Sequence, residues 1–257
     1  RPGAAGTLAA SLVAKAPGDG YTLVLASPSA ITLAPTTMAG RINYDPAKDL
    51  VPVTQVNRYP LILLATPAMG VKSFAEFIAK ARAMPGKINF GSFGPNTSGG
   101  LATEMIKLMA KVDVLHVPFN GGAPLNQALL GGTVDIAFDV MVTGLTNAKA
   151  GKLVPLATTG TKRIPSYPDV KTFVEQGYPM DLAGWVAFMA PKGTPRPIVE
   201  RVSREINKAI QTPDGTAKML QYGLIATGTT PAEFGEIIRK ATPVWEEAFK
   251  ASGLTPE

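Results

Sequence analysis

The chain has 257 residues, of which 46% are hydrophobic and 17% charged, a balance that excludes intrinsic disorder and predicts one large or two average globular domains. The formal net charge of +6 comes from dispersed lysines and arginines, so we expect no nucleic-acid partner. Cysteine is absent, which excludes disulfides and thiolate metal sites, and the longest apolar run, residues 60–68, is too short to span a bilayer.

The hydrophobic pattern switches repeatedly between the helical and the extended period, which is typical of βαβ units around a parallel sheet. The first part of the chain predicts two helices, three strands and a polar loop. In chain order these are a helix at 7–16, a strand at 21–26, the loop from Ser27 to Ser29, strands at 51–56 and 61–65, and a helix at 74–82. Ser73 and Glu76 have the spacing of a capping box at the start of that second helix.

Two consecutive units of strand, glycine-rich loop and helix follow. The strand at 87–90 leads through the loop 91–100 into a helix that ends near 111, and the strand at 112–117 leads through 118–123 into a helix that ends near 130. Loops at the carboxyl ends of strands bind ligands in α/β proteins, and the free N–H groups of a helix start attract a carboxylate or a phosphate. The alternative is that both loops are ordinary turns whose side chains cap helices.

Neither loop matches a nucleotide-binding motif. No basic side chain lies between Lys87 and Lys107, and neither the P-loop pattern nor G-x-G-x-x-G occurs. The donors available in the first loop are hydroxyl and amide side chains, those of Ser92, Asn96, Thr97 and Ser98.

The remaining elements alternate between strand and helix. They are a strand at 133–138 that ends at Asp139, a helix at 141–150, a strand at 153–158, a short helix at 170–176, a strand at 185–190, a helix from the N-cap Thr194 to 211, and a last helix with the capping box of Thr230 and Glu233. Asp135 and Asp139 share one face of the strand end, where they indicate a metal site, an acid–base pair or a helix cap, and for Asp139 also hydrogen bonds to a ligand or to loop amides. Trp185 suits either a pocket wall or the core.

His116 is the one histidine of the sequence and is flanked by Leu115 and Val117 in an apparent strand. This position favours a structural role over that of a general base. No G-x-S-x-G elbow surrounds any serine, so a serine hydrolase is not indicated. An α/β enzyme that acts on a small acid, with Asp139 and His116 as its acid–base pair, stays open as an alternative, as does a ligand-sensing domain.

Several segments together resemble one family of receptors. They are residues 117–124 (VPFNGGAP), 130–139 (LGGTVDIAFD), 150–153 (AGKL) and 190–195 (APKGTP), with Arg1-Pro2-Gly3-Ala4 at the opening and Pro168-Asp169-Val170 before a helix. In this order, and over essentially the whole chain, they are similar to the extracytoplasmic receptors of tripartite tricarboxylate transporters, the Bug or TctC-type proteins.

The resemblance implies an α/β protein with the type II periplasmic-binding-protein fold, in which two α/β lobes are joined by crossing strands and the ligand cleft lies between them. Lobe 1 would comprise residues 1–64 and 186–257, and lobe 2 residues 65–185. It also implies a periplasmic monomer that captures a small organic carboxylate (a di- or tricarboxylate, an acidic amino acid or an aromatic acid). This monomer would deliver the acid to membrane permease subunits without catalysis, cofactor or metal.

The expected ligand-binding residues are Ser27 and Ser29 from lobe 1, Ser92, Thr97, Ser98, Gly121, Gly122 and Asp139 from lobe 2, and Trp185. Two departures from the family pattern stand out. Family members usually have a first strand and a glycine-rich binding loop, followed by the first helix, before the Arg1-Pro2-Gly3 segment, so we expect lobe 1 here to lack its first strand and helix because the sequence is incomplete. At Gly99-Gly100-Leu101 members often carry a bulkier pair ending in His-Leu, so we expect more room at this loop.

Overall fold

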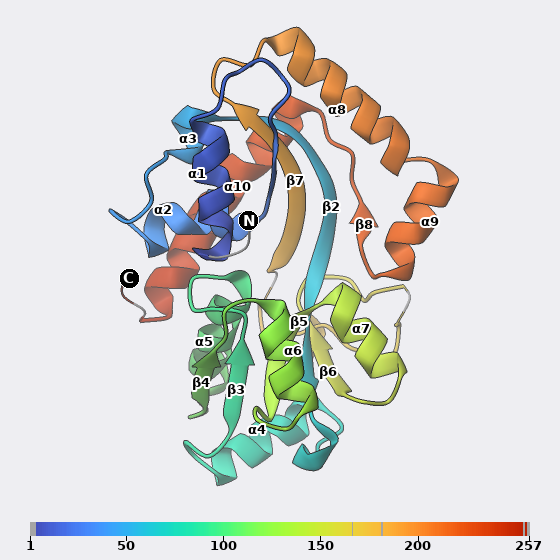
Figure 1. Ribbon diagram of the computed structural model, residues 1–257. Helices are drawn as coiled ribbons and strands as arrows, with labels where there is room; N and C mark the ends of the chain where they lie inside the picture. The colour runs from blue at the N-terminus through green and yellow to red at the C-terminus, as the bar shows by residue number, and fades with distance from the viewer. Residues whose placement is uncertain (1–3, 166, 181, 254, 256–257) are drawn as a thin grey trace. The chain divides into compact units, whose positions relative to one another are not determined.

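The computed structural model describes residues 4–165, 167–180, 182–253 and 255, so most of the Arg1-Pro2-Gly3-Ala4 opening lies outside the described residues. The chain divides into two compact units (Figure 1). Unit 1 comprises Arg1–Arg58, Gly184–Met219 and Ile225–Glu257, and unit 2 comprises Tyr59–Ala183 and Leu220–Leu224. The lobe boundaries that the resemblance implies stay a prediction. They assign residues 220–224 to lobe 1, whereas Leu220–Leu224 belong to unit 2.

Unit 1 holds three strands and part of a fourth, covered by helices from both ends of the chain. Its elements are the 3-10 turn η1 (Ala4–Gly6), α1 (Thr7–Ala14), β1 (Val24–Ala26), the π-helical turn η2 (Ser29–Leu33), α2 (Ala34–Thr37), α3 (Pro46–Asp49), the first part of β2 (Leu50–Ala65), β7 (Ala183–Pro191), α8 (Arg196–Ile210), α9 (Pro213–Gln221), β8 (Ile225–Ala226) and α10 (Pro231–Ala251). The strand order is β1-β7-β2, and β8 also pairs with β2.

Unit 2 contains the rest of β2 and the two strand, loop and helix units. Its further elements are η3 (Pro67–Met69), α4 (Phe74–Ala83), β3 (Asn89–Ser92), α5 (Ser98–Ala110), β4 (Leu115–Pro118), α6 (Gly122–Leu130), β5 (Ile136–Val140), α7 (Met141–Lys149), β6 (Val154–Thr158) and the 3-10 turn η4 (Val174–Gln176). The strand order is β2-β5-β3-β4, and β6 also pairs with β2. With β2 common to both units, the described residues form eight strands in a mixed α/β fold.

The sheet is mixed rather than parallel. In unit 2, β3 pairs in parallel with both β4 and β5, as the sequence predicts for βαβ units. The expectation of a parallel sheet is wrong for β2, which runs antiparallel to β5, β6 and β8, and for β1 against β7. Each of those antiparallel pairs brings together strands that no single crossover helix connects, so the βαβ pattern does not govern them.

The two strands predicted at 51–56 and 61–65 are one continuous strand, β2. The polar residues before Pro60, and Pro60 itself, predict a break because proline has no N–H for the ladder. In the structure the pairs with β8 involve Asn57 and Arg58, and those with β5 and β6 begin at Leu61 and Ile62. The strand therefore changes neighbours at Pro60, where a missing donor costs little.

The strands predicted at 87–90, 112–117 and 133–138 all begin two or three residues later than expected, as β3, β4 and β5. The reason is that buried apolar side chains precede the paired residues. Val112, Val114 and Val134 are at most 6% exposed but lie outside the strands. The hydrophobic pattern of these segments therefore predicts which residues are buried, but not which residues pair in a strand.

The helix predictions are confirmed in outline and corrected at the caps. The capping box of Thr230 and Glu233 at the start of α10 is complete. The prediction that Thr194 caps α8 is wrong, because Pro195 is the N-cap and the Thr194 hydroxyl donates to the Pro191 carbonyl at 2.8 Å. The helix predicted at 170–176 is a single 3-10 turn, and the sequence analysis missed α9.

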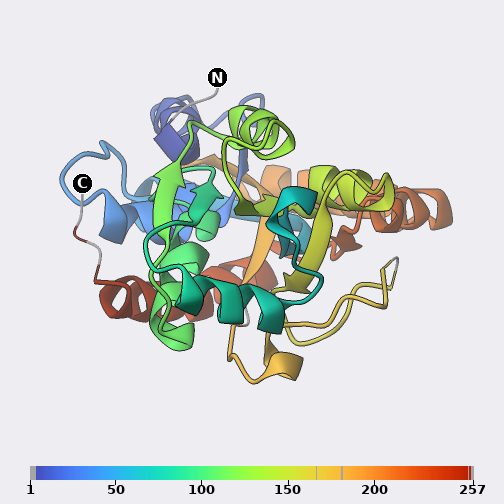
Figure 2. The same ribbon diagram turned by 90° about the horizontal axis from the view of Figure 1, so that it is seen from below.

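Aromatic side chains form the centre of unit 2. Phe74 meets Phe173 and Tyr178 edge to face at 4.9 and 5.0 Å, and Phe90 on β3 contacts Phe77 and Phe138. Such pairs add about 0.5–1.5 kcal/mol each beyond the area they bury. Helix α4, which carries Phe74 and Phe77, is in the foreground of Figure 2. Because Phe90 is on β3 and Phe138 is on β5, the cluster stabilises the two strands that precede the loops.

No helix in the described part of the chain is long and apolar enough to cross a membrane.

Candidate functional site

Three helix starts lie at one edge of the unit 2 sheet. Since β3, β4 and β5 are parallel, their carboxyl ends share an edge, and each leads directly to a helix, α5, α6 and α7 respectively (Figure 1). The first turn of each helix has N–H groups without a partner inside the helix, and its partial positive charge favours an anion. This edge is therefore the place in unit 2 where helix N-termini able to attract an anion converge.

The start of α5 combines a side-chain cap with free donors. Thr97 is the N-cap, and its hydroxyl accepts from the Gly100 N–H at 3.2 Å and donates to the Gly94 carbonyl at 2.6 Å. The N–H groups of Ser98 and Gly99 donate to no backbone carbonyl of a described residue, and the Ser98 hydroxyl has no partner among them either. The Thr97 hydroxyl is thus engaged in the cap, whereas the Ser98 hydroxyl and the N–H groups of Ser98 and Gly99 are buried groups without a partner among the described residues.

The two glycines that follow allow the loop to close onto the helix. A Cβ at Gly100 would be 2.3 Å from the Gly94 carbonyl oxygen, and one at Gly99 would be 2.6 Å from Cζ of Phe93. The expectation that small residues leave more room here is wrong, because the Phe93 ring fills the space over Gly99. Phe93 itself is partly buried against the apolar cluster that contains Leu125 and Met141.

The start of α6 lies beside this loop and is open. The Phe119 N–H donates to the Ser92 carbonyl at 2.8 Å, and the Gly121 N–H donates to the Phe119 carbonyl at 3.0 Å. Gly121 has φ of 101°, a conformation that glycine adopts without strain. Gly122 is exposed, and nothing lies within 4 Å of a Cβ added to it. The first turn of α6 is therefore open to solvent around Gly122.

Asp139, at the end of β5, connects the sheet to the preceding helix α6 and the following helix α7. Its carboxylate is 1% exposed and accepts from the Val140 N–H and the Asn126 amide at 2.8 Å and from the Thr143 hydroxyl at 2.9 Å. The Asn147 amide in turn donates to the Asn126 carbonyl group at 2.8 Å. Burial raises the pKa of Asp139 in spite of these hydrogen bonds.

Asp135 and Asp139 do not act on a common partner. The Asp135 carboxylate accepts from the Asn89 N–H at 2.8 Å, which fixes β5 to β3. In the described part of the chain no group of three His, Cys, Asp or Glu side chains is arranged to hold a metal ion. The contacts of Asp135 therefore join two strands, and those of Asp139 join the end of β5 to the helices α6 and α7.

His116 lies in a chain of polar contacts that the sequence did not reveal. Its Nε2 is 2.7 Å from the Ser92 hydroxyl and its Nδ1 is 2.8 Å from Oε1 of Glu104 on α5, whereas Asp139 is not among its hydrogen-bonded partners. Burial disfavours the charged form of Glu104, but hydrogen bonds from His116 and Lys107 outweigh it and lower its pKa. Ser92 is fully buried, and its oxygen also accepts from the Gly94 N–H at 3.2 Å.

The predicted residues of unit 1 lie in its own core and loops. Ser27 is half-buried, and Ser29, at 8% exposure, starts the turn η2 rather than belonging to a loop. Trp185 on β7 is 3% exposed and packs edge to face on Phe234 with ring centroids 5.2 Å apart. The core alternative accounts for these contacts of Trp185.

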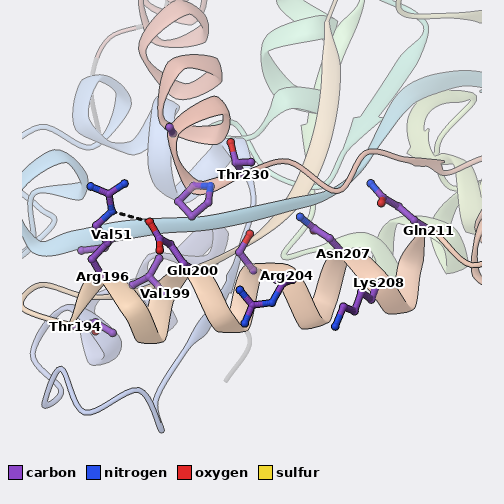
Figure 3. A pocket seen from close by; sticks show the side chains of 13 residues that line it. Val51, Thr194, Arg196, Val199, Glu200, Arg204, Asn207, Lys208, Gln211 and Thr230 are labelled. Carbon is purple, nitrogen blue, oxygen red and sulfur yellow. Dashed lines mark hydrogen bonds and ion pairs between the residues drawn. The ribbon is translucent and has the colours of Figure 1, made fainter.

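Unit 1 also has a groove of about 980 Å³ that includes no predicted site residue (Figure 3). Nine of its thirteen lining residues are polar, and the full set is Val51, Thr194, Arg196, Val199, Glu200, Ser203, Arg204, Asn207, Lys208, Gln211, Thr230, Pro231 and Ala232. Its polar groups largely bond within the protein, since Arg196 pairs with Glu200 at 2.6 Å and the Asn207 amide donates to the Thr229 carbonyl at 2.8 Å. We therefore place the candidate site at the helix starts of unit 2.

Comparisons with known proteins agree with the resemblance. The family model described as the tripartite tricarboxylate transporter family receptor, TctC, matches residues 1–246. The protein BugT of Bordetella pertussis is 34% identical over 232 residues, which cover 90% of this chain and 70% of BugT.

Solved structures are similar over almost the whole chain. A structure from R. palustris with adipate has a TM-score of 0.96 at 32% identity and covers 100% of this chain and 86% of that one. MatC from Rhodopseudomonas palustris, with bound malate, has a TM-score of 0.87 at 29% identity and covers 96% of this chain and 85% of MatC. The fold is that of periplasmic binding proteins, and the chain belongs to the receptor family of the tripartite tricarboxylate transporters.

Proposed function

We propose that this protein is a solute receptor that captures a small organic carboxylate and delivers it to the permease subunits of a tripartite tricarboxylate-type transporter. The observation that carries the proposal is that two neighbouring helices, α5 and α6, begin with amides that donate to no backbone carbonyl of a described residue. The chain that presents them belongs to this receptor family. Adipate and malate, found with two related structures, indicate the class of ligand.

The proposed site binds the carboxylate with neutral donors. The N–H groups of Ser98, Gly99 and Gly122 and the Ser98 hydroxyl supply hydrogen bonds, and the two helix dipoles supply positive potential. No lysine or arginine lies between Lys87 and Lys107. Donors without a formal charge favour reversible capture, because an ion pair does not have to be broken when the acid is released.

Within this proposal Thr97, Ser98, Gly121 and Gly122 form the binding surface of unit 2. Ser92 and Asp139 support it through their contacts with the Gly94 amide and the Asn126 and Thr143 side chains. Ser27, Ser29 and Trp185 stay the proposed contribution of unit 1.

The proposal also covers the location, the oligomeric state and the lack of catalysis of this protein. We place the protein in the periplasm as a monomer that turns over no substrate and needs no cofactor or metal. Family membership supports the receptor role, and the separate hydrogen-bonded partners of His116 and Asp139 argue against the acid–base pair of the alternative enzyme.

A calorimetric titration with adipate, malate and a panel of tricarboxylates and aromatic acids tests the proposal. A ligand at 100 times its Kd should stabilise the protein by about 2.7 kcal/mol in a parallel unfolding experiment. The bound acid should be recovered chemically unchanged by mass spectrometry. Conversion of the acid, or no binding by any member of the panel, would refute the receptor function.

A further inference from the structure

A closed circuit of polar contacts surrounds the start of α5. Lys107 Nζ and His116 Nδ1 approach the two oxygens of Glu104 at 2.9 and 2.8 Å. His116 Nε2 contacts the Ser92 hydroxyl at 2.7 Å, and Ser92 Oγ accepts from the Gly94 N–H at 3.2 Å. Through Thr97, which donates to the Gly94 carbonyl, the circuit returns to the first turn of the same helix that carries Glu104.

The chemistry of the groups determines which atom donates and which atom accepts at each of these contacts. An ionised glutamate only accepts hydrogen bonds, and hydrogen bonds from His116 and Lys107 keep the pKa of Glu104 low. The proton of a neutral imidazole therefore belongs on Nδ1, facing Glu104, which leaves Nε2 as an acceptor. The Ser92 hydroxyl then donates to Nε2, and its lone pairs face the Gly94 N–H.

We propose that His116 is a positioning residue for the carboxylate-binding loop: with its Nδ1 proton held by Glu104, it orients the Ser92 hydroxyl, which fixes Gly94 and so the N-cap of α5. This inference rests on the proposed function. It assigns a binding role to two side chains, His116 and Glu104, that do not reach the ligand themselves. It also makes Ser92 the link between them and the loop.

The order serine, histidine, glutamate is also that of a hydrolase triad, and the structure argues against that use. A nucleophilic serine must reach its substrate, yet Ser92 is 0% exposed. Its oxygen also accepts the Gly94 N–H at 3.2 Å, which leaves it bound on two sides. The arrangement holds a loop in place and has no room for an acyl group.

The inference implies a dependence on pH. Among the described residues, the elements most extensively packed against β4 are β3, which has no titratable side chain, and α5, which presents Glu104 and Lys107. A second proton on the imidazole would make Nε2 a donor and leave the buried Ser92 hydroxyl hydrogen without its acceptor. Carboxylate affinity should therefore fall as the ring of His116 is protonated.

Because the sequence contains one histidine, the ring can be observed without assignment. A 15N NMR spectrum of protein labelled in the imidazole nitrogens, recorded at a pH at which the ring carries one proton, should show that proton on Nδ1 and none on Nε2. Glu104→Gln should replace this state by a mixture of tautomers, because an amide can face Nδ1 as donor or acceptor. Glu175→Gln, the same change at an exposed glutamate paired with Arg163, is the matched control and should leave the spectrum unchanged.

Affinity for adipate and malate completes the test. In His116→Gln the longer amide side chain can accept from Ser92 in place of Nε2, whereas in His116→Asn the amide reaches only the Nδ1 position. We expect His116→Asn to bind at least tenfold more weakly than His116→Gln, and the pH dependence of affinity to disappear in both. A purely structural role would lower the thermal stability of both variants without separating their affinities.

Three results would overturn the inference. They are a wild-type ring protonated on Nε2, equal affinities of His116→Asn and the wild type, and an ester hydrolysis activity that Ser92→Ala abolishes. Failure of the wild type to bind any carboxylate would instead refute the proposed function. In that case the tautomer, which is read without ligand, still decides whether Glu104 and His116 hold the loop in the way described.

Discussion

The ring of Phe93 lies directly over Gly99, with Cζ 2.6 Å and Cε1 and Cε2 2.9 Å from the place that a Cβ at Gly99 would occupy. The loop that precedes α5 and the first turn of the helix are thus matched in shape. Gly99→Ala should destabilise the protein by about 1–3 kcal/mol, because the added methyl displaces the ring. Urea unfolding of the variant measures this cost.

The matched control for this pair is Phe93→Leu, whose shorter side chain leaves space for the methyl group. In the double variant the cost of Gly99→Ala should largely disappear, which a double-mutant cycle reports as a coupling energy. Strict additivity of the two single changes would show that ring and glycine do not depend on each other.

Gly122→Asp should weaken carboxylate binding without harming the fold. Nothing lies within 4 Å of an added Cβ, and an aspartate in the first turn of α6 stabilises the helix by about 0.3–1 kcal/mol. The same negative charge repels a bound carboxylate and should lower affinity at least tenfold in a calorimetric titration with adipate or malate. Gly122→Ala is the neutral control, and equal affinity of Gly122→Asp and Gly122→Ala would remove α6 from the site.

Thr97→Ala should cost about 1 kcal/mol of unfolding free energy, because the Gly100 N–H loses its side-chain acceptor at the start of α5. Thr97→Ser retains the hydroxyl and should recover most of the loss. Denaturant midpoints of the three proteins give the comparison. If the alanine and serine variants were equally stable, the hydroxyl would not be acting as the cap.

Glu104→Gln should destabilise the protein at neutral pH, and the difference from the wild type should depend on pH. The pKa of Glu104 is lower in the folded protein than its ordinary value of 4.5, so its ionisation favours the folded state above that value. As the pH falls through the lowered pKa, this contribution is lost and the two proteins should converge. Unfolding free energies measured from pH 7 to pH 3 test the sign, and a gap that widened on acidification would contradict it.

Local features of the fold could be predicted from the sequence because they depend on neighbours in the chain. The turn glycines and the capping spacing of Thr230 and Glu233 define where helices begin, and the structure confirms the two strand, loop and helix units at these places. The continuous β2 could not be predicted, because Pro60 marks a break locally and its tolerance depends on which strands pair on either side.

The polar contacts at the site were hidden for a different reason. Glu104 is a charged residue within a helix, and charge alone predicts a solvent-exposed position. It is 8% exposed because His116, on a separate strand, and Lys107 meet it there. The contact of Phe93 with Gly99 could not be predicted from the sequence either, because the sequence shows a small residue but not which side chain occupies the space beside it.

The shared strand β2 has a consequence for the order in which the protein is made. Its buried residues Leu61–Leu64 leave the ribosome long before β5 and β6, and its first half precedes β7 by an even longer stretch of chain. Neither compact unit is complete until residues beyond 219 have been synthesised. The growing polypeptide therefore carries an unpaired, strongly apolar strand segment until β5 and β6 have been synthesised, and during this interval the segment must be kept from aggregating.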